Sequence, residues 1–575
     1  MEIWTQVYDP FGSALLSTLI AAIPVVLLLG LIAFGHVQAH MAALIALAAA
    51  FAVCVFGFTM PPAMAGKAAF LGMLNGLFPI GWIIVNVIFL YRLTVENGSF
   101  KTLQESIAGI VPDRRLQLLL IAFCFGAFFE GAAGFGTPVA VTGAILLGLG
   151  FSPLAASGLA LIANTAPVAF GALGTPIITL ASVMQLTGNN EHDAFQLGAM
   201  VGRQLPFFSL IVPFWLIWAF AGFRGMMQIW PAILVCGGSF AGMQFLVSNF
   251  HGPWLVDVVG ALVSMACLVG FLKVWRPRQI WESPSLRNRP DDEPVRVAAP
   301  VALGAAATPA GELAGKTLDK TSGEVLRSWV PWIILCLFVF LWGTQTFKDL
   351  VNPLFAPKWP IDGLHNLIQK VPPVVPKAGL EGAVFSFNIL TMTGTGIFLA
   401  ALVAGLVMRY SPRRLFSAYG ETLWVLRYSL ITVAAMLSLG TLTKYCGVDA
   451  TLGLAFAGSG VLYPFFGTLL GWLGVALTGS DTASNVLFGG LQKIAAQQLG
   501  LSPILMGAAN TSGGVMGKMI DAQSIVVAAT ATNYTGNEGK ILRFVFWHSI
   551  VLAALVGGLI MLQAYVWPFT AMVIH

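Results

Sequence analysis

Two carboxylic acids stand in glycine-rich stretches between long apolar segments. Glu130 lies in the stretch Glu-Gly-Ala-Ala-Gly-Phe-Gly-Thr-Pro, and Asp481 lies in Thr-Gly-Ser-Asp-Thr-Ala-Ser-Asn. A carboxylate inside a membrane costs roughly 2.5 kcal/mol or more, so an acid at such a place is a functional candidate by default. In a low-dielectric site, a carboxyl group can load and release a proton near neutral pH. We predict that both acids carry protons, and the alternative is that they only cap loose backbone amides.

Amide and hydroxyl side chains mark two further breaks in the apolar segments. Each break carries an Asn-Thr pair, and the second continues into Ser-Gly-Gly. Half-helix N-termini at a break offer unpaired N–H groups to the oxygens of an anion. A second interpretation, in which these side chains only satisfy kinked backbone, stays open. The predicted substrate-binding residues at the breaks are Asn164, Thr165, Asn510, Thr511 and Ser512.

Lys518 and Asp521 follow the second break and are separated by about one helical turn. A lysine beside unwound backbone would attract a substrate carboxylate, and Asp521 would be its partner while the site is empty. We therefore add Lys518 to the predicted substrate-binding residues. Asp521 joins Glu130 and Asp481 as a predicted proton-coupling residue. The alternative is that Lys518 and Asp521 form a purely structural ion pair.

These residues need a scaffold inside a membrane, and the composition predicts one. The chain has 575 residues, of which 57% are hydrophobic and 9% are charged, and its mean hydropathy is +0.85. Soluble globular domains do not have this composition. The six cysteines show no metal or redox spacing, and the sequence contains no P-loop, zinc-ligand spacing or Gly-x-Ser-x-Gly motif. We predict a polytopic membrane protein that has no metal or other cofactor and is not an enzyme.

The apolar segments divide into twelve crossings and two hairpins that enter and leave the membrane on one side. The hairpins are expected at 116–150 and 463–499, with one acid at each tip. Asp257 and Lys493 fall near segment ends, so we expect their side chains to reach the interface. The expected crossings are 12–34, 40–58, 70–93, 153–182, 204–222, 230–249, 254–273, 328–347, 384–408, 422–443, 502–530 and 544–567, of which 153–182 and 502–530 are broken.

The stretch that carries the candidate residues occurs twice. Gly150-Phe-Ser-Pro153 corresponds to Gly500-Leu-Ser-Pro503 at an offset of 350 residues, and Ala163-Asn-Thr165 corresponds to Ala509-Asn-Thr511 at an offset of 346. Paired interrupted segments in corresponding places of two halves point to the binding site of a secondary transporter. The repeat therefore favours a transport function.

The positive charges orient the segments. With both termini outside, 18 Lys and Arg residues fall in the inside loops and seven fall in the outside loops, as the positive-inside rule requires. The same threading makes the two halves run in opposite senses. We predict inverted repeats at 1–222 and 328–575, joined through 223–327 by two connecting spans and a cytoplasmic linker. The linker, 276–327, is rich in Pro, Ala and mixed charge and is expected to be flexible.

Five stretches carry a resemblance to a known family. Through them the chain resembles the bacterial L-lactate permease family, and the similarity runs from the opening Trp-Thr-Gln-Val-Tyr-Asp-Pro to the last span. It leaves out only the linker 276–327 and the loop 348–382. The resemblance implies a lactate and glycolate proton symporter of the cytoplasmic membrane. The five stretches are FGAFFEGAAGFGTPVAVT (125–142), NTAPVAFGALGTP (164–176), VGRQLPF (201–207), GWLGVALTGSDTASN (471–485) and AANTSGGVMGKMI (508–520).

More distantly, the hairpin plan resembles the ion-transporter superfamily of dicarboxylate and citrate carriers. Some of those carriers are coupled to sodium, and they place Ser-Asn-Thr motifs at the hairpin tips. This chain departs from that pattern, because its tips hold Glu130 and Asp481 and its Asn-Thr pairs lie only at the span breaks. Protonatable acids at the tips favour protons over sodium as the coupling ion.

The predicted fold is an all-α polytopic membrane protein with two inverted repeats, about twelve spans and both termini outside. The predicted function is uptake of L-lactate and related 2-hydroxymonocarboxylates, such as D-lactate and glycolate, by proton symport across the bacterial inner membrane. We expect a small carboxylate, protons and the lipid bilayer as partners, no nucleic acid, and a homodimer as the candidate assembly. Two alternatives stay open. They are a sodium-coupled di- or tricarboxylate carrier and, more remotely, an intramembrane aspartyl protease built on Glu130 and Asp481.

Overall fold

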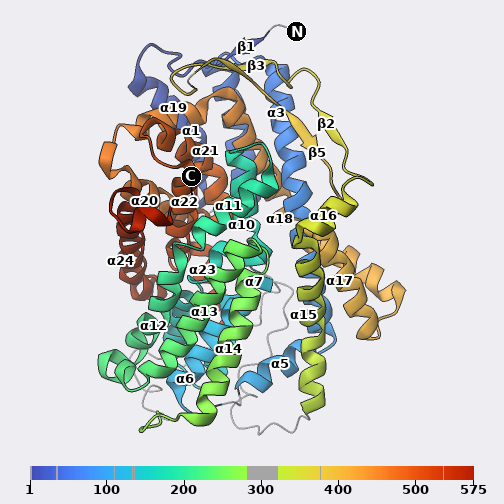
Figure 1. The fold of residues 1–575 in the computed structure, drawn as a ribbon, viewed down its shortest axis with the longest axis vertical. Helices are drawn as coiled ribbons and strands as arrows, with labels where there is room; N and C mark the ends of the chain where they lie inside the picture. Colours follow the sequence, from blue (N-terminus) through green and yellow to red (C-terminus); the bar gives the residue numbers. More distant parts are fainter. Residues whose placement is uncertain are drawn as a thin grey trace.

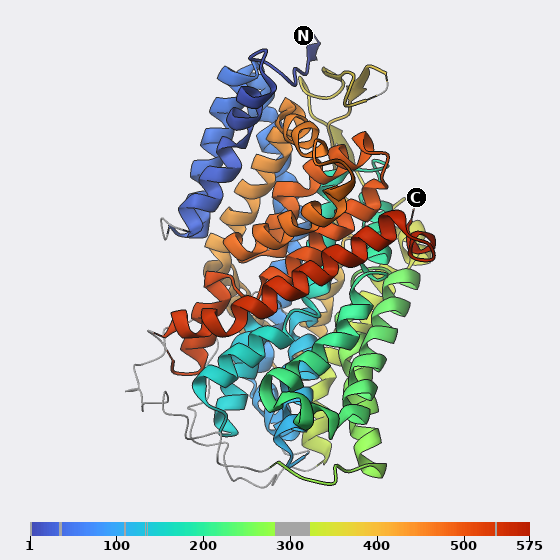
Figure 2. The ribbon, with the colours of Figure 1, turned by 90° about the vertical axis from the view of Figure 1, so that its left-hand side faces the viewer.

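The computed structural model describes residues 3–33, 37–108, 111–132, 134, 136–281, 322–375, 377–534 and 537–574. Within these ranges the chain is mostly helical, and the helices form an elongated bundle (Figure 1, Figure 2). The short strands lie at the end of the bundle that holds the N-terminus, and α5 and α6 lie at the opposite end (Figure 1). Of the predicted linker, residues 282–321 lie outside the described ranges.

The helices of the first half run from α1 to α12, and α13 and α14 follow them. They are α1 Ala14–Ala33, α2 Ala39–Ala52, η1 Val53–Gly57, α3 Pro62–Asn75, η2 Gly76–Gly81, α4 Trp82–Glu96, α5 Ser99–Ala108, α6 Arg114–Leu118, η3 Leu119–Phe125, α7 Gly126–Ala132, α8 Thr137–Gly148, α9 Pro153–Ala163, η4 Val168–Phe170, α10 Gly171–Met184, α11 Asn190–Val201, α12 Leu205–Met227, α13 Trp230–Phe250 and α14 Val256–Val274.

The helices of the second half follow. They are α15 Ser322–Gly343, α16 Gln345–Val351, α17 Thr393–Val407, α18 Pro412–Cys446, α19 Val448–Ala457, η6 Gly460–Leu462, α20 Tyr463–Thr478, α21 Asp481–Gln498, α22 Pro503–Gly517, α23 Ala522–Ala531, α24 Glu538–Tyr565 and η7 Phe569–Met572.

Two pairs of elements show how closely the halves correspond. The helical run Pro62–Glu96 and helix α18 each have 35 residues and begin with proline, a residue suited to the first turn because its missing N–H is not needed there. Helices α9 and α22 also begin with proline, and the hydroxyls of Ser152 and Ser502 cap them in the same way. The local sequence signals of the two halves therefore produce matching elements.

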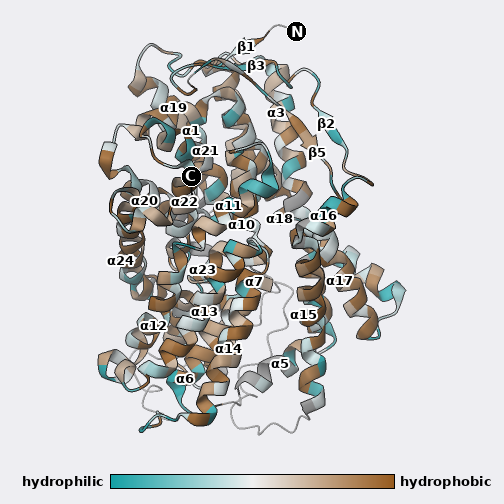
Figure 3. Cartoon of the chain, viewed as in Figure 1, coloured by the Kyte–Doolittle hydropathy of each residue, from teal (hydrophilic) through white to brown (hydrophobic). Residues whose placement is uncertain are grey.

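The helices of the bundle have the length and composition of membrane-spanning segments. Within the described ranges, nine helical runs are long and apolar enough to cross a bilayer, and two sharply bent pairs raise the number to eleven. Apolar residues dominate α14, α15 and α24 (Figure 3). The predicted crossings 12–34 and 384–408 contain shorter apolar helices, Ala14–Leu28 and Thr393–Val407. The chain is a polytopic membrane protein, as the composition predicted.

The two largest buried apolar clusters hold the bundle together. The larger cluster surrounds the first hairpin, where Phe129 meets Phe125 and Phe128 edge to face, with ring centres 4.6 and 5.3 Å apart. The smaller cluster lies among α2, α3, α18 and α21. Together they bury the hairpins against the rest of the bundle.

The fold is mostly helical, as predicted, but short strands that were not predicted also form. The strands are β1 Trp4–Thr5, β2 Lys358–Pro360, β3 Ile368–Lys370, β4 Gly379–Glu381 and β5 Val384–Ser386, and they form the sheets β1-β3-β4 and β2-β5. The predicted crossing 384–408 therefore starts as strand β5, and its helix starts only at Thr393. The physical reason is that β5 pairs with β2, where Trp359 stacks on Phe385 and Phe387.

Each predicted hairpin turns back at a glycine. The first turns between α7 and α8, and the second turns between α20 and α21. Gly136, the residue before α8, has a φ of 80°, and Gly479, the residue after α20, has a φ of 74°. Glycine adopts this conformation without strain. The turns bring each acid close to a hairpin tip.

The two predicted helix breaks differ. The first is confirmed, because α9 ends at Ala163 and a turn begins at Asn164. The second span is also broken, but not at the predicted residues, because α22 runs without interruption through Asn510 and Gly514 to Gly517. The first break contains Pro167, which lacks an N–H and ends a helix, whereas the second stretch has glycines instead. The actual break lies at 518–521, between α22 and α23.

Candidate functional site

Glu130 lies on α7, in the last turn before the tip of the first hairpin. Its residue is only 5% exposed, and its Oε2 atom has no hydrogen-bond partner among the described residues. The amide of Asn164 lies beside the carboxyl group. A methyl group on Gly171 would come within 2.5 Å of Glu130 Oε1, so this glycine leaves the space that the carboxyl group occupies.

Asn164 and Thr165 start the break between α9 and α10. The Thr165 hydroxyl donates to the Ile162 carbonyl at 2.8 Å, so it satisfies the end of its own helix. Asn164 is 2% exposed, and neither polar atom of its amide has a hydrogen-bond partner in the described part of the chain. Asn164 is therefore the residue of this pair with free hydrogen-bonding capacity next to Glu130.

Asp481 is the first residue of α21, at the tip of the second hairpin. The capping alternative fails for this acid, because Ser480 is the N-cap and its hydroxyl accepts from the Ala483 N–H at 3.3 Å. Asp481 is 3% exposed, and neither of its carboxylate oxygens finds a donor within the described ranges. Gly514 leaves room for it, since a methyl group there would lie 2.3 Å from Asp481 Oδ1.

Lys518 connects the second hairpin to the helix break that follows it. Its ammonium group donates to the Gly479 carbonyl at 2.5 Å and lies 3.6 Å from Asp521 Oδ2. The Lys518–Asp521 pair that the spacing predicted is therefore present. The same ammonium group is close enough to act electrostatically on Glu130 and Asp481, so the acids of both hairpins share one cation.

Asp521 also organises the break. Its Oδ1 atom accepts from the Ser524 N–H at 2.7 Å, which caps α23. Its other oxygen faces Lys518. The residue thus holds the start of α23 and the lysine together.

Asp257 is a member of this cluster that the sequence interpretation missed. It lies in the first turn of α14, is 1% exposed, and has no donor for either oxygen among the residues that the structure describes. A methyl group on Gly131 would come within 2.7 Å of Asp257 Cβ, and Asp257 interacts electrostatically with Glu130. The expectation that Asp257 reaches the interface is wrong, because the hairpin tip packs over it. The signal that could have found it is an acid that opens an apolar span.

Lys493 is also not at the interface. Its ammonium group donates to the carbonyls of Met184 and Gln185, both at 2.8 Å. These carbonyls end helix α10, where a positive charge is favoured. Lys493 therefore fixes the first half to the second hairpin.

Asn510, Thr511 and Ser512 lie inside α22 and are fully buried. Asn485 Oδ1 accepts from Asn510 at 2.9 Å and from Thr511 at 2.8 Å. Gln492 donates to Asn510 at 3.1 Å, and Ser512 donates to Gln204 at 2.7 Å. These bonds join α22 to the second hairpin and to the residue before α12.

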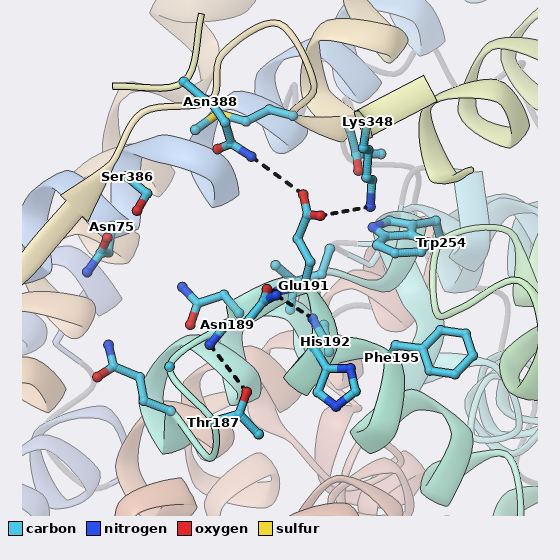
Figure 4. A pocket seen from close by; sticks show the side chains of 18 of the residues that line it. Asn75, Thr187, Asn189, Glu191, His192, Phe195, Trp254, Lys348, Ser386 and Asn388 are labelled. Carbon is cyan, nitrogen blue, oxygen red and sulfur yellow. Dashed lines mark hydrogen bonds and ion pairs between the residues drawn. The ribbon is translucent and has the colours of Figure 1, made fainter. Parts of the chain in front are cut away.

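The acid cluster is defined as Glu130, Asp257, Asp481, Asp521 and Lys518. In the described ranges, no three His, Cys, Asp or Glu side chains are placed to hold a metal ion. A separate cavity of about 1630 Å³ opens among α11, α16 and the segment after β5 (Figure 4). None of the nine residues predicted for the site is among those that line this cavity in the described structure.

An apolar helical bundle in which two hairpin tips bring buried acids near one buried lysine suits a membrane transporter. The comparisons with known proteins then identify the family. The model of the L-lactate permease family matches residues 17–567. The chain belongs to this family, which makes it a permease of the bacterial inner membrane and not an enzyme.

Three relatives show how far the similarity extends. The glycolate permease of Escherichia coli K12 is 44% identical over 580 residues, covering 100% of both chains. The L-lactate permease of the same strain is 43% identical over 580 residues, and that of Bacillus subtilis 168 is 40% identical over 586 residues; each alignment covers 98% of this chain and 99% of the relative. Among solved structures, a transporter from Alcanivorax borkumensis is similar at a TM-score of 0.43, with 13% identity and 86% of each chain covered.

Proposed function

We propose that this protein takes up L-lactate and related 2-hydroxymonocarboxylates, including D-lactate and glycolate, by proton symport. The substrate class is supported by relatives named L-lactate permease and glycolate permease at 40 to 44% identity over nearly the whole chain. Proton coupling is supported by the acid cluster. These two supports are independent of each other.

The observation that carries proton coupling is the imbalance of charge in the acid cluster. Glu130, Asp257, Asp481 and Asp521 are each at most 5% exposed, and Lys518 is the cation that the described residues place among them. Several ionised carboxylates around one ammonium group are costly in a low-dielectric interior. Carboxyl groups in this cluster are therefore suited to bind protons, and the two at the hairpin tips are suited to carry them.

A co-transported proton also removes an electrical cost. An anion that moves inward against an inside-negative potential meets a barrier of roughly 2.3 kcal/mol per 100 mV. One proton cancels this charge, and further protons would drive accumulation. In this proposal Glu130 and Asp481 carry protons, and Asp521 releases Lys518 to the substrate carboxylate.

We place the substrate between the two hairpin tips. Among the described residues, the Asn164 amide beside Glu130 has no hydrogen-bond partner of its own, so it is suited to the hydroxyl or carboxyl group of the substrate. Thr165, Asn510, Thr511 and Ser512 already have protein partners. They would contact substrate only if the substrate replaced these protein hydrogen-bond partners during transport.

We further propose that residues 1–222 and 328–575 are inverted repeats, connected through 223–327, with both termini outside. The matching 35-residue elements support the repeat, and contacts among the loops support the placement of both termini on one side of the membrane. The homodimer stays a prediction.

The test is transport by purified protein in lipid vesicles. Wild-type protein should accumulate L-lactate when a pH gradient is imposed and should exchange lactate for lactate without one. Glu130→Gln and Asp481→Asn keep shape but cannot titrate, so at least one should abolish accumulation while it spares exchange. Asp362→Asn, which removes an exposed carboxylate in the outer loop, is the control and should leave both activities intact.

Other results would contradict the proposal. Accumulation that survives in both acid variants would end the assignment of the hairpin acids. Uptake that depends on sodium and ignores a protonophore would favour the sodium-coupled carrier. Absence of any lactate exchange by the wild-type protein would overturn the substrate class itself.

A further inference from the structure

The cavity among α11, α16 and the segment after β5 has a buried lysine in its wall. Lys348 lies on α16 and is 4% exposed, and its ammonium group lies 4.5 Å from the ring centre of Trp254. A cation over an aromatic face is attracted by the ring and is held in place. Lys348 is therefore a fixed positive charge beside a cavity of about 1630 Å³.

The carboxylate of Glu191 forms an ion pair with this lysine (Figure 4). Glu191 Oε2 lies 3.2 Å from the Lys348 ammonium group, and Glu191 Oε1 accepts from the Asn388 amide at 3.5 Å. The lysine, the amide and the glutamate come from α16, from the segment after β5 and from α11, so the site joins three separate parts of the chain. One ammonium group and one amide thus bind the two oxygens of one carboxylate.

The two members of the ion pair are held very differently. The Lys348 side chain is 5% exposed, whereas the Glu191 side chain is 37% exposed and extends from the first turn of α11 into the cavity. A flexible, partly exposed acid can move away from its partner at little cost. The buried lysine cannot lose its partner without a large desolvation penalty, so a second carboxylate must replace the first.

The other charges around the cavity do not compete for this role. Glu381, which also lines the cavity, lies 2.8 Å from Lys370 and 3.2 Å from Lys444 and is already paired. Lys358 lines the cavity as an exposed residue of strand β2 and lacks the buried aromatic support of Lys348. A free carboxylate that enters the cavity would therefore be bound best at Lys348.

We propose that Lys348 and Asn388 form an outer binding site for the substrate carboxylate, in which a 2-hydroxymonocarboxylate displaces Glu191 before it moves to the acid cluster. This inference rests on the proposed transport of such acids. Glu191 acts as a tethered competitor that occupies the site while substrate is absent. The exchange replaces one carboxylate by another, so the lysine stays paired throughout.

The test compares the half-saturating concentrations of L-lactate for exchange in vesicles. Lys348→Met should raise this concentration about tenfold, as expected for the loss of one charge-assisted contact. Glu191→Gln should lower it severalfold, because the competing carboxylate is gone. The double variant should resemble Lys348→Met, and Lys377→Met, which removes an exposed lysine of the outer loop outside the cavity lining, should resemble wild type.

A structural ion pair makes a different prediction, in which both single variants lose folded protein together and the half-saturating concentration stays unchanged. That outcome, or a change of the same sign in both, overturns the proposal. If Lys348→Met does not fold, Lys348→Arg should keep the affinity and Asn388→Ala should weaken it, and the reverse pattern overturns the proposal equally. If the wild-type protein exchanges lactate and the variants have the same half-saturating concentration, only the outer site is refuted. If the wild-type protein does not exchange lactate at all, the proposed function is refuted.

Discussion

Close packing, more than hydrogen bonding, holds the acids of the acid cluster in place. Glycines at 131, 171 and 514 leave room for Asp257, Glu130 and Asp481, and a methyl group at any of them would meet an acid within 2.7 Å. The acids therefore lie in tight pockets while their oxygens keep few partners. A carboxyl group that is positioned by packing can change its protonation state without breaking a network of hydrogen bonds.

Asp257 should belong to the same functional unit as Glu130. In Asp257→Asn, an amide can no longer repel a neighbouring carboxylate, so the pH profile of lactate uptake should shift toward acid by about one unit. Protein abundance should stay near normal, because the change keeps the shape of the side chain. Initial uptake rates against external pH measure the shift, with Ser264→Ala on the same helix as the control. A profile that coincides with wild type would remove Asp257 from the proposal.

Glu381 on strand β4 should make the protein sensitive to acid. Burial alone would raise its pKa, but the neighbouring Lys444 and Lys370 outweigh burial and lower the pKa to about 2. A lowered pKa stabilises the fold above the ordinary value near 4.5, and this contribution of roughly 3 kcal/mol is lost as the pH falls from about 5 toward 2. The thermal midpoint in detergent should fall over this range in wild type. Glu381→Gln should lower the midpoint at neutral pH and flatten the acid dependence, and an unchanged slope would contradict the assignment.

At the scale of elements, the second half is built on a very close crossing of α20 and α22. A methyl group on Gly471 would lie 2.0 Å from the Asn510 carbonyl oxygen, and one on Gly513 would lie 2.2 Å from the Thr468 carbonyl oxygen. Small residues allow helix backbones to approach in this way. Gly513, which lies in the stretch predicted as a helix break, therefore serves packing, and the closeness of the crossing sets where Lys518 meets the hairpin tip.

Gly471→Ala should destabilise the protein by about 1–3 kcal/mol, because the backbones of α20 and α22 would have to move apart to make room for the methyl group. Gly558→Ala on α24 is the matched control, since a methyl group there has no atom within 4 Å and alanine is the better helix former. The yield of monodisperse protein and its thermal midpoint should fall for the first variant only. Equal behaviour of the two variants would show that the crossing tolerates a larger side chain.

At the scale of the whole molecule, contacts link the loops that the charge pattern assigned to each side. On one side, Trp4 pairs with Ile368, Gln498 donates to the Pro373 carbonyl, and Ser502 donates to the Ile574 carbonyl. On the other side, Arg414 pairs with Glu96, and Arg115 donates to the carbonyls of Gly225 and Gln279. Both sets agree with the threading in which the two termini share one side.

Labelling from outside should decide the orientation. Single cysteines at positions 5 and 572 should react with a membrane-impermeant reagent in intact cells, in a background that lacks the six native cysteines. A single cysteine at position 300 should react only after the cells are opened, since the positive-inside rule places the linker in the cytoplasm. Reaction at 300 in intact cells would reverse the orientation and remove the support for inverted repeats.

The sequence by itself determined the membrane class, the two helix turns that hold the acids, the first break and the pairing of Lys518 with Asp521. These features depend on local signals, namely apolar length, proline and glycine at turns, and charges about one helical turn apart. The family followed from stretches that surround the same residues. The features that the sequence determined are therefore those that depend only on residues close together in the chain.

Only the tertiary structure decided which polar residues are free and which are bound. Asn510 and Asn164 look equivalent in the sequence, yet Asn510 is bonded to Asn485 across the second hairpin, whereas Asn164 lies beside Glu130 with no hydrogen-bond partner in the described part of the chain. Asp257 lies far from both hairpins along the chain and joins the acid cluster through packing against Gly131. Lys348 becomes a buried cation only because Trp254 and Glu191 meet it. Burial and pairing depend on segments that are distant in the chain, and no local pattern encodes them.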